Sequence, residues 1–173
     1  CRFYGNFDNQ LSNCYQSNLG LVNCLIDGRG TDNGIVMENG RLDRCTVVNC
    51  KTGLLVLKSA TVKNSVFSAC QDQLIVVRSG ALPDFCLSKT LLNLGKATFG
   101  DKQVADPAGW ESLAPEVKWA TGVIIAAPAL SGPDYVVPED SPYRTAADYG
   151  MSLGAILSAE REWRGESGTA SDT

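Results

Sequence analysis

Ser59-Ala60-Thr61-Val62-Lys63-Asn64-Ser65-Val66-Phe67-Ser68-Ala69-Cys70 is the stretch of sequence that decides the fold. It joins two short apolar segments through a polar corner at Lys63 and Asn64. The second segment has two earlier counterparts, at spacings of 20 and 21 residues, Cys45-Thr46-Val47-Val48-Asn49 and Cys24-Leu25-Ile26-Asp27-Gly28. Because runs of β-branched residues between turn-forming Gly, Asn, Asp and Ser are typical of strands, the sequence predicts a repeated strand–turn–strand unit.

Further columns of similar residues repeat in step with this one. They are the tetrapeptides beginning at Gly34, Gly53 and Gln73, and the columns Leu21, Leu42, Val62, Leu82; Asn23, Arg44, Asn64, Asp84; and Cys50, Cys70. A unit of roughly 20 residues is too short for a strand, a crossover helix and a returning strand. It suits one coil of a parallel β-solenoid, in which like residues stack about 4.8 Å apart.

The repeat pattern over residues 1–90 resembles the right-handed parallel β-helix family, the pectate-lyase-like fold. The resemblance implies an all-β protein of about four coils in which turn asparagines stack. Asn23, Asn64 and Asp84 fall at such positions, and Arg44 interrupts their column. The resemblance is specific for the fold and not for an activity, because unrelated activities share this fold.

The C-terminal part predicts a mixed cap on the solenoid. Residues 134–155 are similar to the closing segment of bacterial secreted or surface β-helix proteins, some of which are receptor kinases whose β-helix lies outside the cell. Asp106 and Pro107 predict the start of a short helix that Pro115 ends. We therefore expect coils over 1–105, a cap over 106–157 and a flexible tail over 158–173. Residue 1 aligns with Cys24 inside a coil, which predicts the C-terminal portion of a longer β-helix.

Composition excludes several classes of function. The 173 residues carry 15 Lys plus Arg and 19 Asp plus Glu, and this net charge of −4 argues against nucleic acid or an anionic membrane as partner. The complete lack of histidine excludes Ser-His-Asp and Cys-His catalysis and His-ligated zinc within this chain. The most apolar stretch, 123–130, is too short to span a bilayer, which predicts no membrane insertion by this segment.

Seven cysteines without any CxxC pair predict a buried ladder of free thiols. Two alternatives stay open. Stacked coils bring Cys24 and Cys45 within disulfide range, although parallel side chains suit that bond poorly. Metal binding is the other alternative, and the spacing of the cysteines matches no known metal motif.

Charged residues near the predicted turns are the weak candidates for a site. In polysaccharide lyases of the resembled fold a Lys or Arg removes a proton next to a uronic carboxylate, often with calcium on nearby Asp residues. This resemblance makes Lys58, Lys63 and Arg78 candidate catalytic residues and Asp43 and Asp84 candidate ligand-binding residues. A structural alternative is an Asp43–Lys63 ion pair at a solvated edge. No carboxylate cluster supports calcium, so we expect no metal and no cofactor unless the chain is lyase-like.

An aliphatic stripe is expected on the outside of the second ladder. If Ile35, Leu54 and Leu74 point inward, alternation turns Val36, Leu55 and Ile75 outward. Such a stripe is usually covered. The covers we consider are the C-terminal segment, with Trp110, Trp119 and residues 123–125, or a second subunit in a homo-oligomer.

Three functions are compatible with these observations. The leading hypothesis is a non-catalytic surface or secreted domain that binds carbohydrate or a protein partner. The second is the C-terminal part of a polysaccharide lyase-like enzyme acting on acidic glycans, and the third is the outer domain of a membrane receptor kinase. All three place the chain outside the cell or at its surface.

Overall fold

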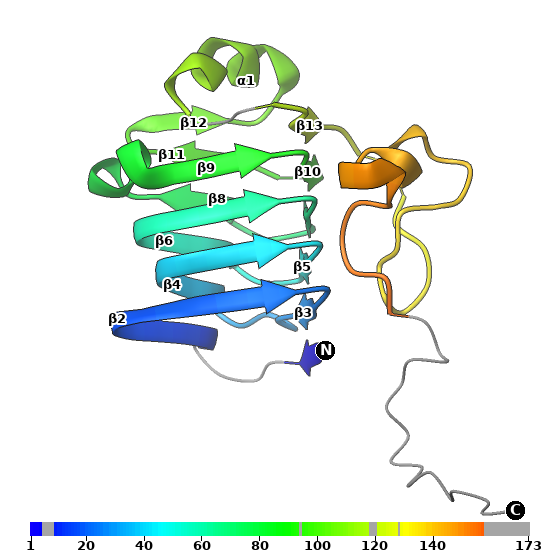
Figure 1. Cartoon of the computed structure of the whole chain (residues 1–173), viewed down its shortest axis with the longest axis horizontal. Helices are drawn as coiled ribbons and strands as arrows, with labels where there is room; N and C mark the ends of the chain where they lie inside the picture. The colour runs from blue at the N-terminus through cyan, green and yellow to red at the C-terminus, as the bar shows by residue number, and fades with distance from the viewer. Residues whose placement is uncertain (5–8, 94, 118–120, 128, 158–173) are drawn as a thin grey trace, which may run out of the picture.

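The computed structural model of the chain is a β-solenoid whose coils stack along one axis (Figure 1). It describes residues 1–4, 9–93, 95–117, 121–127 and 129–157, and only the backbone over 9–17. The chain runs from left to right along the front strands of Figure 1 while it rises, so the coil is right-handed. The fold class predicted from the repeat is confirmed.

One side of the solenoid is a sheet of short parallel strands. Leu25 pairs with Thr46 and Thr46 with Val66, which reproduces the predicted spacings of 21 and 20 residues. Arg2 pairs with Leu25, so the alignment of residue 1 with Cys24 is also confirmed. The strands are, in spatial order, β1 (Arg2–Tyr4), β3 (Leu25–Asp27), β5 (Thr46–Val48), β7 (Val66–Ser68), β10 (Leu91–Asn93) and β13 (Ile124–Ile125).

The other side is a sheet built on long strands that bend around the solenoid. Its strands are, in spatial order, β12 (Lys102–Val104), β11 (Ala97–Phe99), β8 (Gln73–Val77), β6 (Thr52–Lys63), β4 (Asn33–Asp43) and β2 (Asn9–Val22), and β9 (Phe85–Ser88) also pairs with β6. All these pairings are parallel except the antiparallel pair β11–β12. The coil therefore closes between two sheets whose inner faces meet.

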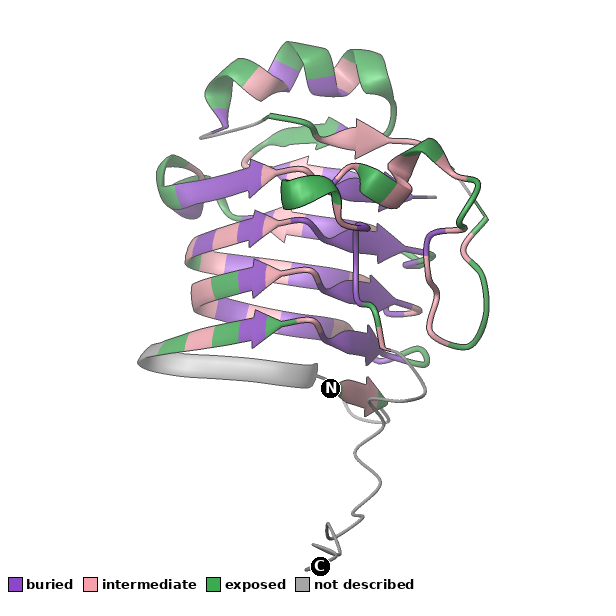
Figure 2. Ribbon diagram, turned by 45° about the vertical axis from the view of Figure 1, so that its right-hand side comes forward, coloured by how far each residue is buried: buried purple, intermediate pink, exposed green. Residues whose placement is uncertain are grey.

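The core lies between these inner faces. Alternation along each short strand turns one set of residues inward, where Ile26, Val47 and Phe67 join the main core. Val56 lies two residues after inward-facing Leu54 on β6, and it is completely buried. Figure 2 shows this as buried segments along the successive strands of both sheets. Stacked burial of this kind makes each coil depend on its neighbours.

Two predicted columns have the wrong register, because the coils differ in length. The N–H groups of Asp72 and Gln73 both donate to the Lys51 carbonyl, at 3.0 and 3.1 Å, so this turn holds one extra residue. Leu54 consequently pairs with Ile75 and not with Leu74. Ile75 is therefore buried in the core, and the outward aliphatic column is Val36, Leu55 and Val76.

The turn column is likewise displaced in the next coil. A 3-10 helix, η1 (Ser79–Asp84), is inserted before β9, and Val62 pairs with Leu87 instead of Leu82. Asp84 is therefore at the end of η1 and does not stack on Asn64. Lys89 takes that place, since the Asn64 N–H donates to the Ser88 carbonyl that precedes it.

Helix α1 (Pro107–Leu113) closes the last coil. The Asp106 side chain accepts from the Gly109 N–H at 2.7 Å, as an N-cap does, so the predicted helix start is confirmed. Trp110 packs on Phe99 with a ring separation of 5.6 Å. A 3-10 turn, η2 (Ala114–Glu116), follows. The helix thus covers the apolar end of the stack (Figure 1).

The remaining C-terminal segment runs back along the short-strand sheet. It contains η3 (Pro142–Thr145) and η4 (Asp148–Gly150), and we call residues 146–157 the strap. Val137, Ala147 and Leu153 pack on Val66 and Leu91, and Ala155 packs on Leu25 and Val48. The prediction that this segment covers the stripe of the long-strand sheet is therefore wrong. Trp119 and the predicted tail 158–173 lie outside the described residues.

Candidate functional site

The corners after the long strands form a column of left-handed residues. Asn23, Arg44, Asn64 and Lys89 have φ values of 53°, 52°, 53° and 42°. Asn adopts this conformation more readily than other non-glycine residues, because its short polar side chain can form local hydrogen bonds. The repeated conformation points successive side chains out of the same edge of the solenoid.

The strap is held by this turn column. The Asn64 Oδ1 accepts from the Asp148 N–H at 3.0 Å, and the Asn64 carbonyl accepts from the Gly154 N–H at 2.8 Å. Two coils below, the Asn23 amide exchanges two hydrogen bonds with the Ile156 backbone, at 2.8 and 3.1 Å. The turn asparagines therefore pair the strap in the way that a neighbouring strand would.

Asp43 and Lys63, two of the predicted site residues, meet beside the strap. Lys63 Nζ lies 3.8 Å from an oxygen of Asp43 and 3.8 Å from one of Asp148. Lys89 Nζ lies 2.6 Å from the other oxygen of Asp148. We call Asp43, Lys63, Lys89 and Asp148 the junction cluster. This geometry fits the alternative of an Asp43–Lys63 ion pair at the edge of the solenoid. Asp148 of the strap adds a second carboxylate to that pair.

The junction cluster is balanced in charge and satisfied internally. The Lys89 ammonium, and then the Asn64 amide, hold the pKa of Asp148 below its usual range. Asn64 also donates to Asp43 at 2.9 Å. Each carboxylate thus has cationic and amide partners, as expected for a clamp that fixes the strap to the solenoid.

The other predicted site residues lie elsewhere. Lys58 forms an ion pair with Glu38 on the neighbouring coil. Arg78 is exposed just before η1, and its N–H donates to the Val56 carbonyl, which places it level with Leu57. Asp84 is exposed at the end of η1. The fold thus brings Asp43 and Lys63 together but assembles no single site from Lys58, Lys63 and Arg78.

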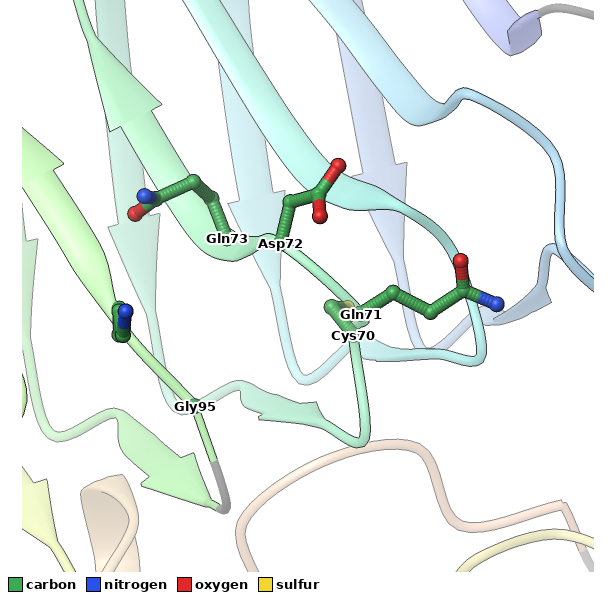
Figure 3. A pocket seen from close by; sticks show the side chains of 6 residues that line it. Cys70, Gln71, Asp72, Gln73 and Gly95 are labelled. Carbon is green, nitrogen blue, oxygen red and sulfur yellow. The ribbon is translucent and has the colours of Figure 1, made fainter.

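A pocket opens at the opposite corner, where the short strands lead into the long ones. It encloses about 510 Å³. Its lining residues are Cys70, Gln71, Asp72, Gln73, Gly95 and Lys96, and we call it the turn pocket (Figure 3). This volume is in the range of small-molecule sites, roughly 300–1,000 Å³. Amide, carboxylate and ammonium groups give it both donors and acceptors.

The backbone around the turn pocket is fixed from coil to coil. The Gln71 N–H donates to the Cys50 carbonyl at 2.9 Å, and the Leu74 N–H donates to the Lys96 carbonyl at 2.6 Å. The Thr98 hydroxyl donates to Gln73 Oε1 at 3.1 Å, which orients that amide. Figure 3 shows Gln71, Asp72 and Gln73 extending from the turn in different directions. The backbone of the turn and the Gln73 amide are therefore held in place beside the hollow.

Polar side chains continue along this corner below the pocket. Lys51 and Asp32, on the two preceding coils, form an exposed ion pair. Since coils stack about 4.8 Å apart, a chain lying parallel to the solenoid axis meets a polar side chain at each step.

Six described cysteines are free, and five of them are buried. This agrees with the predicted ladder of free thiols; Cys14 lies in the part where side chains are not described. No group of three or more Asp, Glu, Cys or His within the described ranges is arranged to hold a metal ion. No described helix is long and apolar enough to cross a membrane.

Sequence reasoning missed Lys89, Asp148 and the turn pocket. The η1 insertion hides Lys89 from a fixed spacing of about 20 residues, and Asp148 reaches the junction cluster only through tertiary docking of the strap. The sequence held one signal for the pocket, the polar run Gln71-Asp72-Gln73 between two apolar segments. Comparisons with protein-family models, curated proteins and solved structures find no match for this chain.

Proposed function

We propose that this chain is a non-catalytic β-solenoid module that binds an oligosaccharide in the turn pocket. The observation that carries the proposal is the gathering of two amides, a carboxylate and an ammonium group around one hollow of about 510 Å³. Sugar hydroxyls donate and accept hydrogen bonds at once, so they match a lining that offers both kinds of partner. Lys96 adds a site for the carboxylate of an acidic sugar.

The repeat along the axis supports a polymeric ligand. The polar corner extends from the turn pocket to Lys51 and Asp32, so a sugar chain lying along it gains contacts on successive coils. Backbone hydrogen bonds between coils already hold this corner in place, so the protein loses less conformational entropy when a ligand binds. A polysaccharide ligand also suits a secreted or surface location, which remains a prediction of this proposal.

Binding to a panel of neutral and uronic-acid oligosaccharides tests the function. We expect a double Gln71→Ala, Gln73→Ala variant to raise Kd about tenfold, the effect of losing two hydrogen bonds of about 0.5–1.5 kcal/mol each. Gln103→Ala is the matched control, because Gln103 is an exposed glutamine on β12 that does not line the turn pocket.

Asp72→Asn and Lys96→Ala distinguish neutral from acidic ligands. Loss of Lys96 should weaken acidic sugars and leave neutral ones unchanged, and Asp101→Asn is the control for Asp72→Asn, since both carboxylates are exposed. The proposal is abandoned if no oligosaccharide binds, or if the turn pocket variants bind as tightly as the wild type does.

A further inference from the structure

Cys50 and Cys70 are stacked on neighbouring coils, and Cys70 lines the turn pocket. Val48 pairs with Ser68, and each cysteine follows two residues later in the same register. The Gln71 N–H donates to the Cys50 carbonyl at 2.9 Å, so the backbones stay paired through these positions. Neighbouring parallel strands are about 4.8 Å apart. This lies within the Cα separation of disulfides, about 4.4–6.8 Å, so the bond forms if the two parallel side chains turn toward each other.

The two thiols interact with each other. The interaction between the thiols lowers the pKa of Cys50 and raises that of Cys70. Each S–H also donates to a carbonyl of its own coil, Cys50 to Val48 at 3.3 Å and Cys70 to Ser68 at 3.6 Å. The Thr31 hydroxyl lies beside the Cys50 sulfur, since a Cβ added at Gly28 would meet Cys50 Sγ at 2.5 Å and Thr31 Oγ1 at 2.6 Å. Cys50 is therefore the better-stabilised thiolate of the pair.

Access to this pair is one-sided. Cys50 is completely buried, whereas Cys70 is 7% exposed and lines the turn pocket. Lys96 and Asp72 flank the pocket with opposite charges. A small molecule that carries both carboxylate and ammonium groups matches these charges on its way to Cys70.

We propose that Cys50 and Cys70 form a redox-active dithiol that exchanges with low-molecular-weight disulfides of the amino-acid type entering the turn pocket. The product is a disulfide between two successive coils. This activity goes beyond oligosaccharide binding and does not depend on it.

The exchange balances in two steps. In the first, Cys70 sulfur attacks one sulfur of the entering disulfide, the S–S bond of the reagent breaks, and the Cys70 proton passes to the sulfur that leaves, which departs as a thiol. In the second, Cys50 sulfur attacks the Cys70 sulfur of the mixed disulfide and its proton goes to the leaving group. The protein dithiol loses two electrons and two hydrogens, and the reagent is reduced to two thiols.

Cys24 and Cys45 stack in a similar way, but Cys24 has a second neighbour. The Leu25 N–H donates to the Cys1 carbonyl at 2.8 Å, so Cys1 lies level with Cys24 on the other side. By contrast, Cys50 lies between Thr31 and Cys70, and the neighbour of Cys70 on the far side is the chain around Gly95. The inference is therefore confined to Cys50 and Cys70, which have no competing cysteine among the described residues.

Incubation of the reduced, full-length chain with glutathione disulfide tests the proposal. Peptide mapping by mass spectrometry should find Cys50 linked to Cys70, with loss of two hydrogens. Cys50→Ser should stop at a glutathione adduct on Cys70, because the resolving thiol is gone. Cys70→Ser should leave Cys50 unmodified, because Cys50 is buried. Cys86→Ser, another buried thiol without a cysteine in register, is the control and should not change the map.

The proposal is overturned if Cys50 and Cys70 both stay reduced while exposed Cys1 reacts, or if either bonds to a different cysteine. Circular dichroism checks that each serine variant folds. If a serine variant does not fold, the peptide map of the wild-type chain tests the proposal, since it detects a Cys50–Cys70 disulfide without any substitution.

A pair of reagents tests the entry route. Lys96→Ala should slow the reaction of Cys70 with glutathione disulfide about threefold, the size of one exposed ion pair. It should not slow the reaction with the uncharged bis(2-hydroxyethyl) disulfide. Equal slowing of both reagents, or of neither, overturns entry through the turn pocket.

Discussion

Replacing Gly154 with alanine tests whether the strap depends on close contact with the solenoid. Gly154 has a φ of +76°, and an added Cβ would lie 2.5 Å from Thr46 Oγ1 and 2.9 Å from Val66 Cγ2. Both neighbours are β-branched and buried, so neither can move away without disturbing the short-strand sheet.

The expected cost has three parts. A left-handed alanine costs about 1 kcal/mol relative to glycine. Displacement of Thr46 breaks its hydrogen bond from the Ala155 N–H, which is 2.8 Å long, for about 1 kcal/mol. Overpacking against Val66 adds about 1–3 kcal/mol. We therefore expect a loss of about 3–5 kcal/mol in the free energy that docks the strap.

Gly150→Ala is the matched control. Gly150 has a φ of +68° in the same strap, but no atom lies within 4 Å of an added Cβ, so only the backbone cost of about 1 kcal/mol applies. Hydrogen exchange at the Gly154 and Ala155 amides measures strap docking, and urea denaturation measures the global free energy of unfolding. Equal losses in Gly154→Ala and Gly150→Ala would refute the close-contact argument.

Three further substitutions concern the core and the junction cluster. Val56→Asp should abolish folding, as seen by circular dichroism, because a charge without a partner would be buried. Lys63→Ala should lower the free energy of unfolding by less than about 1 kcal/mol, since the ion pairs of Lys63 are long and partly exposed. Similar losses of stability in Val56→Asp and Lys63→Ala would contradict the assignment of Val56 to the inside of β6 and of Lys63 to the outside. The pKa of Asp148 is lower in the folded chain than the unfolded value near 3.9, so its contribution is complete above that pH and is lost as the pH falls through the folded value. Asp148→Asn should therefore flatten the acid side of the stability curve below about pH 4, and an unchanged slope in urea titrations would remove Asp148 from the clamp.

The repeat predicted the solenoid because burial is periodic along the chain. Three strands of the short-strand sheet lie where the columns through Leu25, Thr46 and Val66 predicted them. The register failed where coil length changed. The continuous apolar run Leu74–Val77 carries no alternation that fixes its phase, so one extra residue at Asp72 moved Ile75 from the predicted outside to the core.

The candidate site was less predictable than the fold. Asp43 and Lys63 are one repeat apart in the sequence, so they lie side by side on neighbouring coils. The repeat alone was therefore enough to predict their ion pair. Asp148 reaches them across more than 80 residues, and no periodicity links it to the coils. The turn pocket depends on where two turns leave space, which is set by three-dimensional packing and not by any single motif.

The direction in which the strap runs has a consequence for synthesis. Coils can stack as they leave the ribosome, since each needs only the coil before it. The outward apolar residues Leu25, Val48, Val66 and Leu91 stay uncovered until residues 137–155 have been made. This later-made segment must then reach back to coils that were made well before it, as the bond between Asn23 and Ile156 shows. A nascent chain therefore carries an exposed apolar face until residues 137–155 have been made, and a chaperone that shields this face should raise the yield of folded chain.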